Sequence, residues 1–174
     1  MSKYSGIEQA TGTSKFPFHN EVGTYIVSIR SWGCPASKNP GPTLGQYMDI
    51  IEWDVVKCLV GDASPVGGTR VRIRPVRQMG AMDEIKARAQ VVSTAFGRQL
   101  QDGFEFPMKD VTEALLDSIT ENNGRQYVGI LVKIQVSPPT IGKVSGKPFT
   151  PISYSVPTAA DLEGITHTKG RLTA

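Results

Sequence analysis

Hydrophobic and polar residues alternate through the first half of the chain, a pattern that predicts β-strands with one buried face. The alternation is strictest in 69–77, where Val71 and Ile73 alternate with arginines. A similar alternation predicts a strand at 23–32. Between these two segments, 46–60 is rich in β-branched and aromatic residues, and its length predicts one long, bent strand. Three strands are therefore expected in this half.

The period of the pattern changes after the third strand. Hydrophobic residues recur every three or four positions through 83–96, and Asp83 and Gly97 suit the two ends of a helix. A second helix is expected to begin near Asp110, where an Asp and a Glu three residues apart resemble a capping box, and to stop at 122–124. Two helices are therefore predicted before the next strand.

Strand patterns return in the last third of the chain. Alternating Val and Ile residues predict a strand at 126–137, and 148–156 is expected to be an edge strand because it contains a proline. Loops rich in proline and glycine are expected at 34–45 and 138–147.

The order of these elements is three strands, two helices and two strands, which is the order of the OB-fold. That fold is mainly β, a five-stranded Greek-key barrel that often binds oligonucleotides. We therefore predict one OB-type domain at 23–156 with a helical insert between strands 3 and 4, an N-terminal arm at 1–22 and a C-terminal tail at 157–174. A strand meander packed against two helices, without closure of a barrel, is the alternative for the same order of elements.

Composition agrees with one folded domain and argues against several other classes of protein. Of 174 residues, 39% are hydrophobic and 20% are charged, values typical of globular domains. The two cysteines, Cys34 and Cys58, are far apart and show no metal-binding spacing. No apolar run is long enough to span a membrane, and the first residues lack the apolar core of a signal peptide. We therefore expect a cytoplasmic protein without a disulfide framework and without contact to a membrane.

No arrangement of residues points to catalysis. The two histidines, His19 and His167, lie in the predicted terminal segments, and the chain lacks the signature of a phosphate-binding loop. Asp49, Glu52 and Asp54 are close in sequence but have no histidine beside them, so surface charge explains them better than a metal site does. We expect a protein that is not an enzyme and that holds neither a metal nor a cofactor.

The net charge of +3 permits an anionic partner without requiring one, so the placement of the charges matters more than their sum. Alternation puts Arg70, Arg72 and Arg74 on one face of the third predicted strand, with Arg77 just beyond. Such close like charges repel one another unless anions or acidic residues compensate them. The carboxylates of the neighbouring strand would turn the row into surface ion pairs. An open row would instead suit the phosphates and bases of a single strand.

Aromatic residues and loop lysines complete the predicted contacts with nucleic acid. Trp32 shares its predicted face with Arg30 at the mouth of the first loop, and Tyr47 and Trp53 alternate together along the second strand. These rings would stack on bases, although each could equally belong to the core. The lysines of the two breaker-rich loops are Lys38, Lys143 and Lys147.

Over about 20–156 the chain resembles the OB-fold single-stranded DNA-binding proteins of tailed bacteriophages. The resemblance rests on layout: the segment 23–29, the long second strand, a double-glycine turn into an arginine-bearing strand, and 142–149. It implies that the arginines and lysines hold the DNA backbone and that the aromatic rings stack bases. Many such proteins end in an acidic tail that recruits partners, whereas 166–174 is mildly basic, so recruitment through this end is not expected.

Two functions from different classes follow. The first is binding of single-stranded DNA without strong sequence preference, which protects the DNA during phage replication or recombination. Replication or recombination proteins, and a second copy of the chain in a homodimer, are further candidate partners. This function requires the arginine row to line an open trough with an indole nearby. The alternative is a virion structural or interaction protein built on a β-barrel domain, suggested by the Phe-Pro-Phe sequence at 16–18 and the breaker-rich loops.

Overall fold

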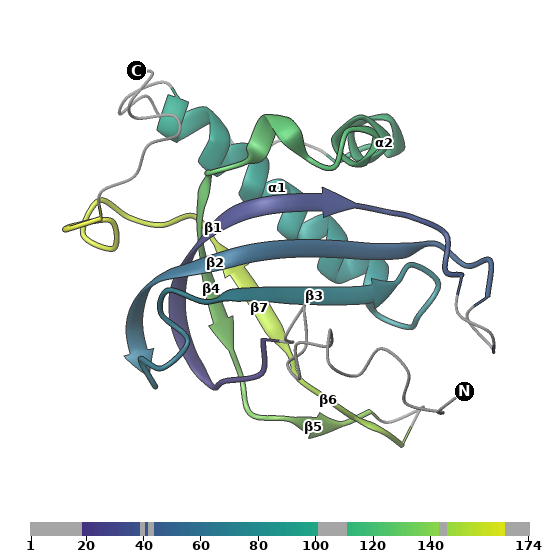
Figure 1. The fold of residues 1–174 in the computed structure, drawn as a ribbon, viewed down its shortest axis with the longest axis horizontal. Coiled ribbons are helices and arrows are strands. Elements are labelled where there is room, and N and C mark those ends of the chain that lie inside the picture. Colours follow the sequence, from purple (N-terminus) through teal and green to yellow (C-terminus); the bar gives the residue numbers. More distant parts are fainter. Residues whose placement is uncertain (1–18, 39–40, 42–43, 101–110, 143–145, 166–174) are drawn as a thin grey trace, which may run out of the picture.

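The computed structural model describes residues 19–38, 41, 44–100, 111–142 and 146–165. Within them the chain is mainly β, as predicted, with a strongly curved antiparallel sheet and two helices packed against it (Figure 1). The strands of the sheet are β1 (Gly23–Gly33), β2 (Met48–Gly61), β3 (Thr69–Pro75), β4 (Leu131–Val136) and β7 (Ile152–Ser155). The helices are α1 (Ala81–Leu100) and α2 (Glu113–Glu121), and a short 3-10 helix spans Arg125–Tyr127.

The sheet is a half-barrel, in the order β3-β2-β1-β4-β7. β1 lies at its centre and pairs with both β2 and β4. This order leaves β3 and β7 as the two edges, and within the described residues no ladder joins them. Side chains bridge the gap instead, because Arg72 Nη1 donates to the carbonyl oxygen of Thr150 at 2.8 Å. The predicted five-stranded sheet is therefore confirmed.

A small two-stranded ribbon lies where the sequence predicts a loop and the start of an edge strand. It consists of β5 (Thr140–Ile141) and β6 (Pro148–Phe149) and projects from the lower part of the sheet in Figure 1. The last strand of the main sheet begins only at Ile152, one residue after Pro151, since proline cannot donate to a ladder.

Helix α1 is longer than predicted and continues through Gly97 instead of ending there. Its last turn is held by Gln99, whose amide donates to the carbonyl of Leu131 at 2.7 Å and accepts from the Leu131 N–H at 2.9 Å. This pair of hydrogen bonds joins the end of the helix to the start of β4. A contact between distant segments thus outweighs the local tendency of glycine to end a helix.

The second helix begins at Thr112, whose hydroxyl accepts a hydrogen bond from the N–H of Leu115 at 3.2 Å. The predicted cap, Asp110, lies outside the described residues. Neither helix is long and apolar enough to cross a membrane, within the part of the chain that the structure describes.

The core lies between the concave face of the sheet and α1. Alternate residues of β1, β2 and β4 meet Ile85, Ala89 and Val92 of the helix there. The largest fully buried side chains are Trp32 and Trp53. Burial of these apolar surfaces supplies most of the driving force for folding. The helix is thereby fixed across the open side of the half-barrel, next to β3 and β7.

Part of the convex face is covered by the segment 157–165. Lys57 Nζ donates to the carbonyl oxygens of Asp161 and Glu163 at 3.1 and 2.9 Å, and Lys133 forms an ion pair with Asp161 at 3.2 Å. Ile26, on this face of β1, is completely buried. This end of the convex face is therefore not open to a ligand.

Candidate nucleic-acid interface

The arginine row of β3 faces the inside of the half-barrel. Each arginine lies opposite an inward residue of β2: Arg74 opposite Asp49, Arg72 opposite Ile51, and Arg70 opposite Trp53. Alternation correctly separates the row from Val71 and Ile73, but the expectation that the row faces solvent is corrected. Alternation tells which residues share a face, and it does not tell which face is buried.

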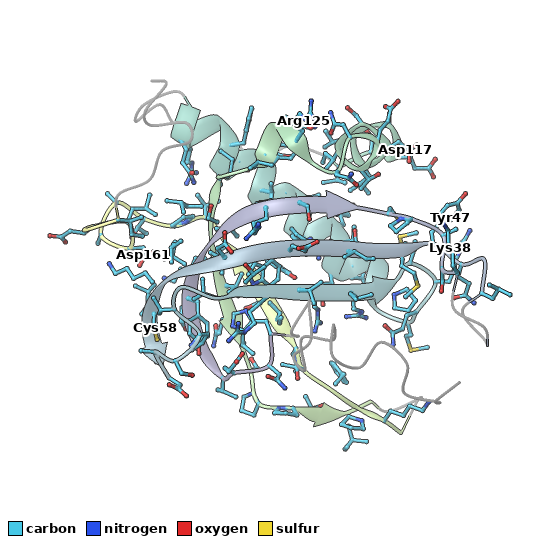
Figure 2. The ribbon with its side chains drawn as sticks, in the orientation of Figure 1. Lys38, Tyr47, Cys58, Asp117, Arg125 and Asp161 are labelled. Carbon is cyan, nitrogen blue, oxygen red and sulfur yellow. The ribbon has the colours of Figure 1, made fainter. Side chains whose placement is uncertain are left out.

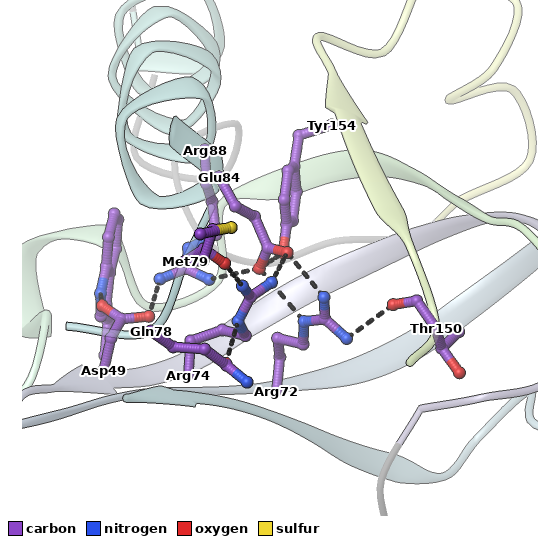
Figure 3. A network of polar contacts seen from close by, with 10 residues as sticks. Asp49, Arg72, Arg74, Gln78, Met79, Glu84, Arg88, Thr150 and Tyr154 are labelled. Atoms are coloured by element: carbon purple, nitrogen blue, oxygen red, sulfur yellow. Dashed lines mark hydrogen bonds and ion pairs between the residues drawn. The ribbon is translucent and has the colours of Figure 1, made fainter. Parts of the chain in front are cut away.

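A carboxylate of α1 holds two of these arginines. Arg72 donates from Nε and Nη2 to Glu84 at 3.1 and 2.6 Å, and Arg74 donates from Nη1 to the same carboxylate at 2.8 Å (Figure 3). Arg74 also donates to Gln78 Oε1 and to the carbonyl of Met79. The two arginine side chains are only 12% and 14% exposed. Both arginines are therefore engaged within the fold. Their partner is Glu84 of α1, and not a carboxylate of the neighbouring strand β2, as the sequence suggested.

Glu84 is ionised in this arrangement. Its burial favours the neutral acid, but the hydrogen bond and charge of Arg72, with the charges of Arg88 and Arg74, outweigh that effect and lower its pKa. Tyr154 completes the group from β7, with its hydroxyl 3.4 Å from Glu84 Oε2. Burial raises the pKa of Tyr154 to about 12, although the positive charge of Arg88 opposes the rise. Its hydroxyl is therefore a hydrogen-bond donor at neutral pH.

Deeper in the half-barrel, Arg88 of α1 is completely buried and donates to Asp49 of β2. Desolvation alone would lower the pKa of Arg88, but the charge of Asp49 outweighs it and raises that pKa. Trp32 Nε1 donates to Asp49 Oδ1 at 2.7 Å, and the Arg88 guanidinium lies 4.6 Å from the centre of the Trp32 ring. Such a buried pair costs much desolvation, so the loss of one member leaves a strongly unfavourable charge.

Trp32 belongs to this buried group because β1 contains a bulge. The register shifts between Ile29 and Ser31, which puts Trp32 opposite Ile51 on the inner face. Without the bulge, Trp32 would share the outer face with Arg30, as the sequence predicts. Simple alternation does not reveal a bulge, and this is why the predicted pairing of an indole with Arg30 fails.

The third arginine of the row, Arg70, pairs with Glu21 at 3.1 Å. Beside it, Trp53 Nε1 donates to His19 Nδ1 at 3.0 Å, and both rings are buried. Burial lowers the pKa of His19 to about 4; the charge of Glu21 opposes the decrease and that of Arg70 adds to it. Trp53 is therefore a core residue with a neutral histidine as its acceptor, and neither indole lies in an open trough.

Three other predicted residues do meet at one end of the sheet. Tyr47 forms a β-bridge with Ala36, and its carbonyl accepts from the N–H of Val76 at 3.0 Å. These backbone contacts bring the flanking residues Lys38 and Arg77 to the same end, and Figure 2 shows Lys38 and Tyr47 there. We refer to Lys38, Tyr47 and Arg77 as the loop end.

The side chains of the loop end are exposed. Tyr47 is 63% exposed, and Lys38 and Arg77 are exposed as well. The described part of the chain offers an ion-pair partner to neither cation. Unlike the row on β3, these groups are held by no ion pair within the residues that the structure describes.

Two other predicted cations, Arg30 and Lys147, lie apart from the loop end. Arg30 is on the convex face, 55% exposed, and contacts Asp54 at 3.3 Å and Thr69 Oγ1 at 3.1 Å. Lys147 is exposed next to β6. Lys143 lies outside the described residues. No group of three or more potential metal ligands occurs in the part of the chain that the structure describes.

The buried pair of Arg88 and Asp49 is not among the residues predicted from the sequence, although the position of Arg88 in the helical pattern indicates it. Arg88 lies three residues after Ile85 and four before Val92, so the helical period places it on the apolar face of α1. A charged residue on such a face needs a buried partner. Asp49 on the inner face of β2 is that partner.

The sequence matches no model of a known protein family, and a search of curated proteins finds no significant match.

Proposed function

We propose that the protein binds single-stranded DNA without strong sequence preference, and that the loop end makes the main contacts in place of the open arginine trough that the sequence suggested, because the fold itself occupies those arginines. The strand order supports an OB-type architecture, because β1 is shared by two halves of the curved sheet and the edges β3 and β7 face each other across a gap. Such a partly open five-stranded barrel is a common scaffold for oligonucleotide binding.

The observation that carries the proposal is the exposed ring of Tyr47 at the same end of the sheet as two exposed cations, Lys38 and Arg77, that have no ion-pair partner among the described residues. Every base has a flat face, so an exposed aromatic ring can stack on any base, and this contributes about 1–3 kcal/mol. Lys38 and Arg77 can contact phosphates and release the counterions that surround them. Their combination suits an unpaired strand, because the bases of a duplex are already stacked on one another.

A salt titration of the wild-type protein tests this function. A fluorescent oligothymidine and a labelled duplex of the same length are titrated with protein, and the anisotropy is followed at several salt concentrations. Two phosphates contacted by Lys38 and Arg77 predict a slope of about −1.4 for log affinity against log salt, from about 0.7 per phosphate. No binding at low salt, or equal binding of the duplex, contradicts the proposal.

The alternative, a virion structural or interaction protein, would need exposed apolar side chains that form a contiguous surface. Several large apolar side chains are exposed within the described residues, among them Leu44 at 60%, Val60 at 64% and Met79 at 73%. Exposed apolar residues are typical of interaction surfaces where they form a contiguous patch. Sedimentation of the protein with and without oligothymidine separates the two functions: a large closed assembly that does not respond to DNA supports the alternative.

A further inference from the structure

The gap between the two edges of the half-barrel contains a groove of about 400 Å³. Its floor consists of Arg72, Arg74, Glu84 and Tyr154, the residues that converge in Figure 3. Its sides are mostly apolar and include Phe149. The volume lies within the usual range of small-ligand sites, which combine apolar walls with a few convergent polar groups.

The rim of the groove is accessible. Phe149 of β6 is 46% exposed, and Met79, on the opposite side, is 73% exposed. Both line the groove, together with Pro151 and Ile152. The groove therefore offers one exposed aromatic ring and an apolar wall to a ligand that enters from solvent.

The floor offers hydrogen-bond donors and a net positive charge. Two guanidinium groups face a single ionised carboxylate, so the floor carries an excess of one positive charge. Arg72 uses three of the five N–H groups of a guanidinium in its contacts with Glu84 and Thr150. Its remaining N–H groups can donate further hydrogen bonds to a polar ligand edge, whereas the carboxylate of Glu84 already accepts from Arg72, Arg74 and Tyr154.

We infer that this groove takes one unpaired nucleobase of the bound strand. A base has a flat apolar face for Phe149 and, on its edge, acceptor atoms for the guanidinium groups of the floor. A bare phosphate fits less well, since it would compete with Glu84 for the same donors and would leave the apolar rim unused. The inference rests on the proposed function in one respect: the base is taken to be part of a bound single strand.

The position of the groove agrees with this assignment. Met79 lies two residues after Arg77 of the loop end, and Arg74 on the floor donates to the carbonyl of Met79. A strand whose phosphates contact the loop end can therefore reach the mouth of the groove if it runs along the loop that joins β3 to α1. Phe149 bounds the groove on the far side, in the ribbon of β5 and β6.

The first test compares two variants of the same ribbon. Phe149→Ala removes the ring at the groove, whereas Ile141→Ala removes a side chain of β5 that is 63% exposed and does not line the groove. We expect Phe149→Ala to weaken oligothymidine binding about 5-fold or more, the low end for loss of one stacked base. Binding of a fully abasic strand and the affinity of Ile141→Ala should be unchanged. Equal losses for both variants, or none for Phe149→Ala, would overturn the inference.

A second test separates the groove from the strand-binding function. Thymidine and the other free nucleosides carry no phosphate, and saturation-transfer NMR detects their weak binding. We expect saturable transfer from the wild type and its loss in Phe149→Ala, even if no oligonucleotide binds and the proposed function fails. Identical transfer in both proteins contradicts the base site. An acidic peptide that binds the wild type but not Phe149→Ala, while nucleosides bind neither, would assign the groove to a different partner and overturn the inference.

Discussion

Two groups of positive side chains, three residues apart in sequence, have opposite surroundings. Arg72 and Arg74 face inward and share the carboxylate of Glu84, with side chains 12% and 14% exposed. Arg77 lies just beyond β3 and is exposed at the loop end. A paired, half-buried arginine must lose its partner before it can bind a phosphate, whereas a solvated one loses only counterions. The position of a cation relative to the core therefore decides whether it is available to a ligand.

The largest effect is expected from the deepest pair. Arg88→Met leaves Asp49 buried with only Trp32 as a donor, so we expect a loss of about 3–5 kcal/mol in the free energy of unfolding. Urea denaturation measures this loss. Arg125→Met is the matched control, because Arg125 is exposed and should change stability by about 0.5 kcal/mol or less. Similar small effects for both variants would show that the buried pair does not stabilise the fold.

The buried histidine beside Trp53 makes the stability of the fold depend on pH. His19 titrates near 4 in the folded protein and near 6.5 when unfolded, so the unfolded chain takes up the proton first as pH falls. Stability is therefore complete above about pH 6.5 and decreases by about 3 kcal/mol down to pH 4, at 1.36 kcal/mol per pKa unit. His19→Asn keeps an acceptor for Trp53 Nε1 but cannot titrate. An equally steep decrease in that variant would assign the pH dependence to other groups.

Trp32 and Tyr47, the two aromatic residues nearest the first loop, should differ in their contribution to stability, because one is buried and the other is exposed. Trp32→Phe removes the N–H donor to the buried Asp49, and we expect a loss of about 1–3 kcal/mol in stability. Tyr47→Phe changes a ring that is 63% exposed and should leave the thermal midpoint unchanged. Calorimetry of the two variants compares them directly. A stable Trp32→Phe protein would mean that Asp49 is satisfied without the indole.

The smallest effect is expected on the convex face. Arg30→Ala breaks an ion pair between side chains that are 55% and 37% exposed, and such surface pairs contribute about 0–1 kcal/mol. Because salt screens this exposed pair, the difference in stability between Arg30→Ala and the wild type should be smaller still at high salt. If urea denaturation showed a larger loss, Arg30 would have a structural role that its exposure does not suggest.

Much of the fold follows from local sequence patterns. Alternation in β1 and β3, the β-branched and aromatic residues of β2 and the helical period of α1 predict these elements within a few residues of their observed ends. The errors occur where a distant contact decides. Gln99 binds Leu131 and so extends α1 past Gly97.

The site is less predictable, because it depends on which face of β3 is buried. The partners of the row on that face are Glu84 and Glu21, which come from other parts of the chain. The bulge before Trp32 likewise depends on pairing between strands. The sequence names each residue of the loop end, Lys38, Tyr47 and Arg77, as a candidate. Only the backbone pairing in the structure shows that they lie at the same end of the sheet.

The most direct test of the account is the affinity for oligothymidine of a protein with Lys38→Ala, Tyr47→Ala and Arg77→Ala combined. Its thermal midpoint should equal that of the wild type, because all three side chains are exposed. Its affinity at low salt should fall by about 10-fold or more, from one lost stacking contact and two lost phosphate contacts. Arg30→Ala, which removes an equally exposed but paired cation, should bind nearly as the wild type does. An unchanged affinity of the combined variant would contradict the claim that the loop end binds the strand.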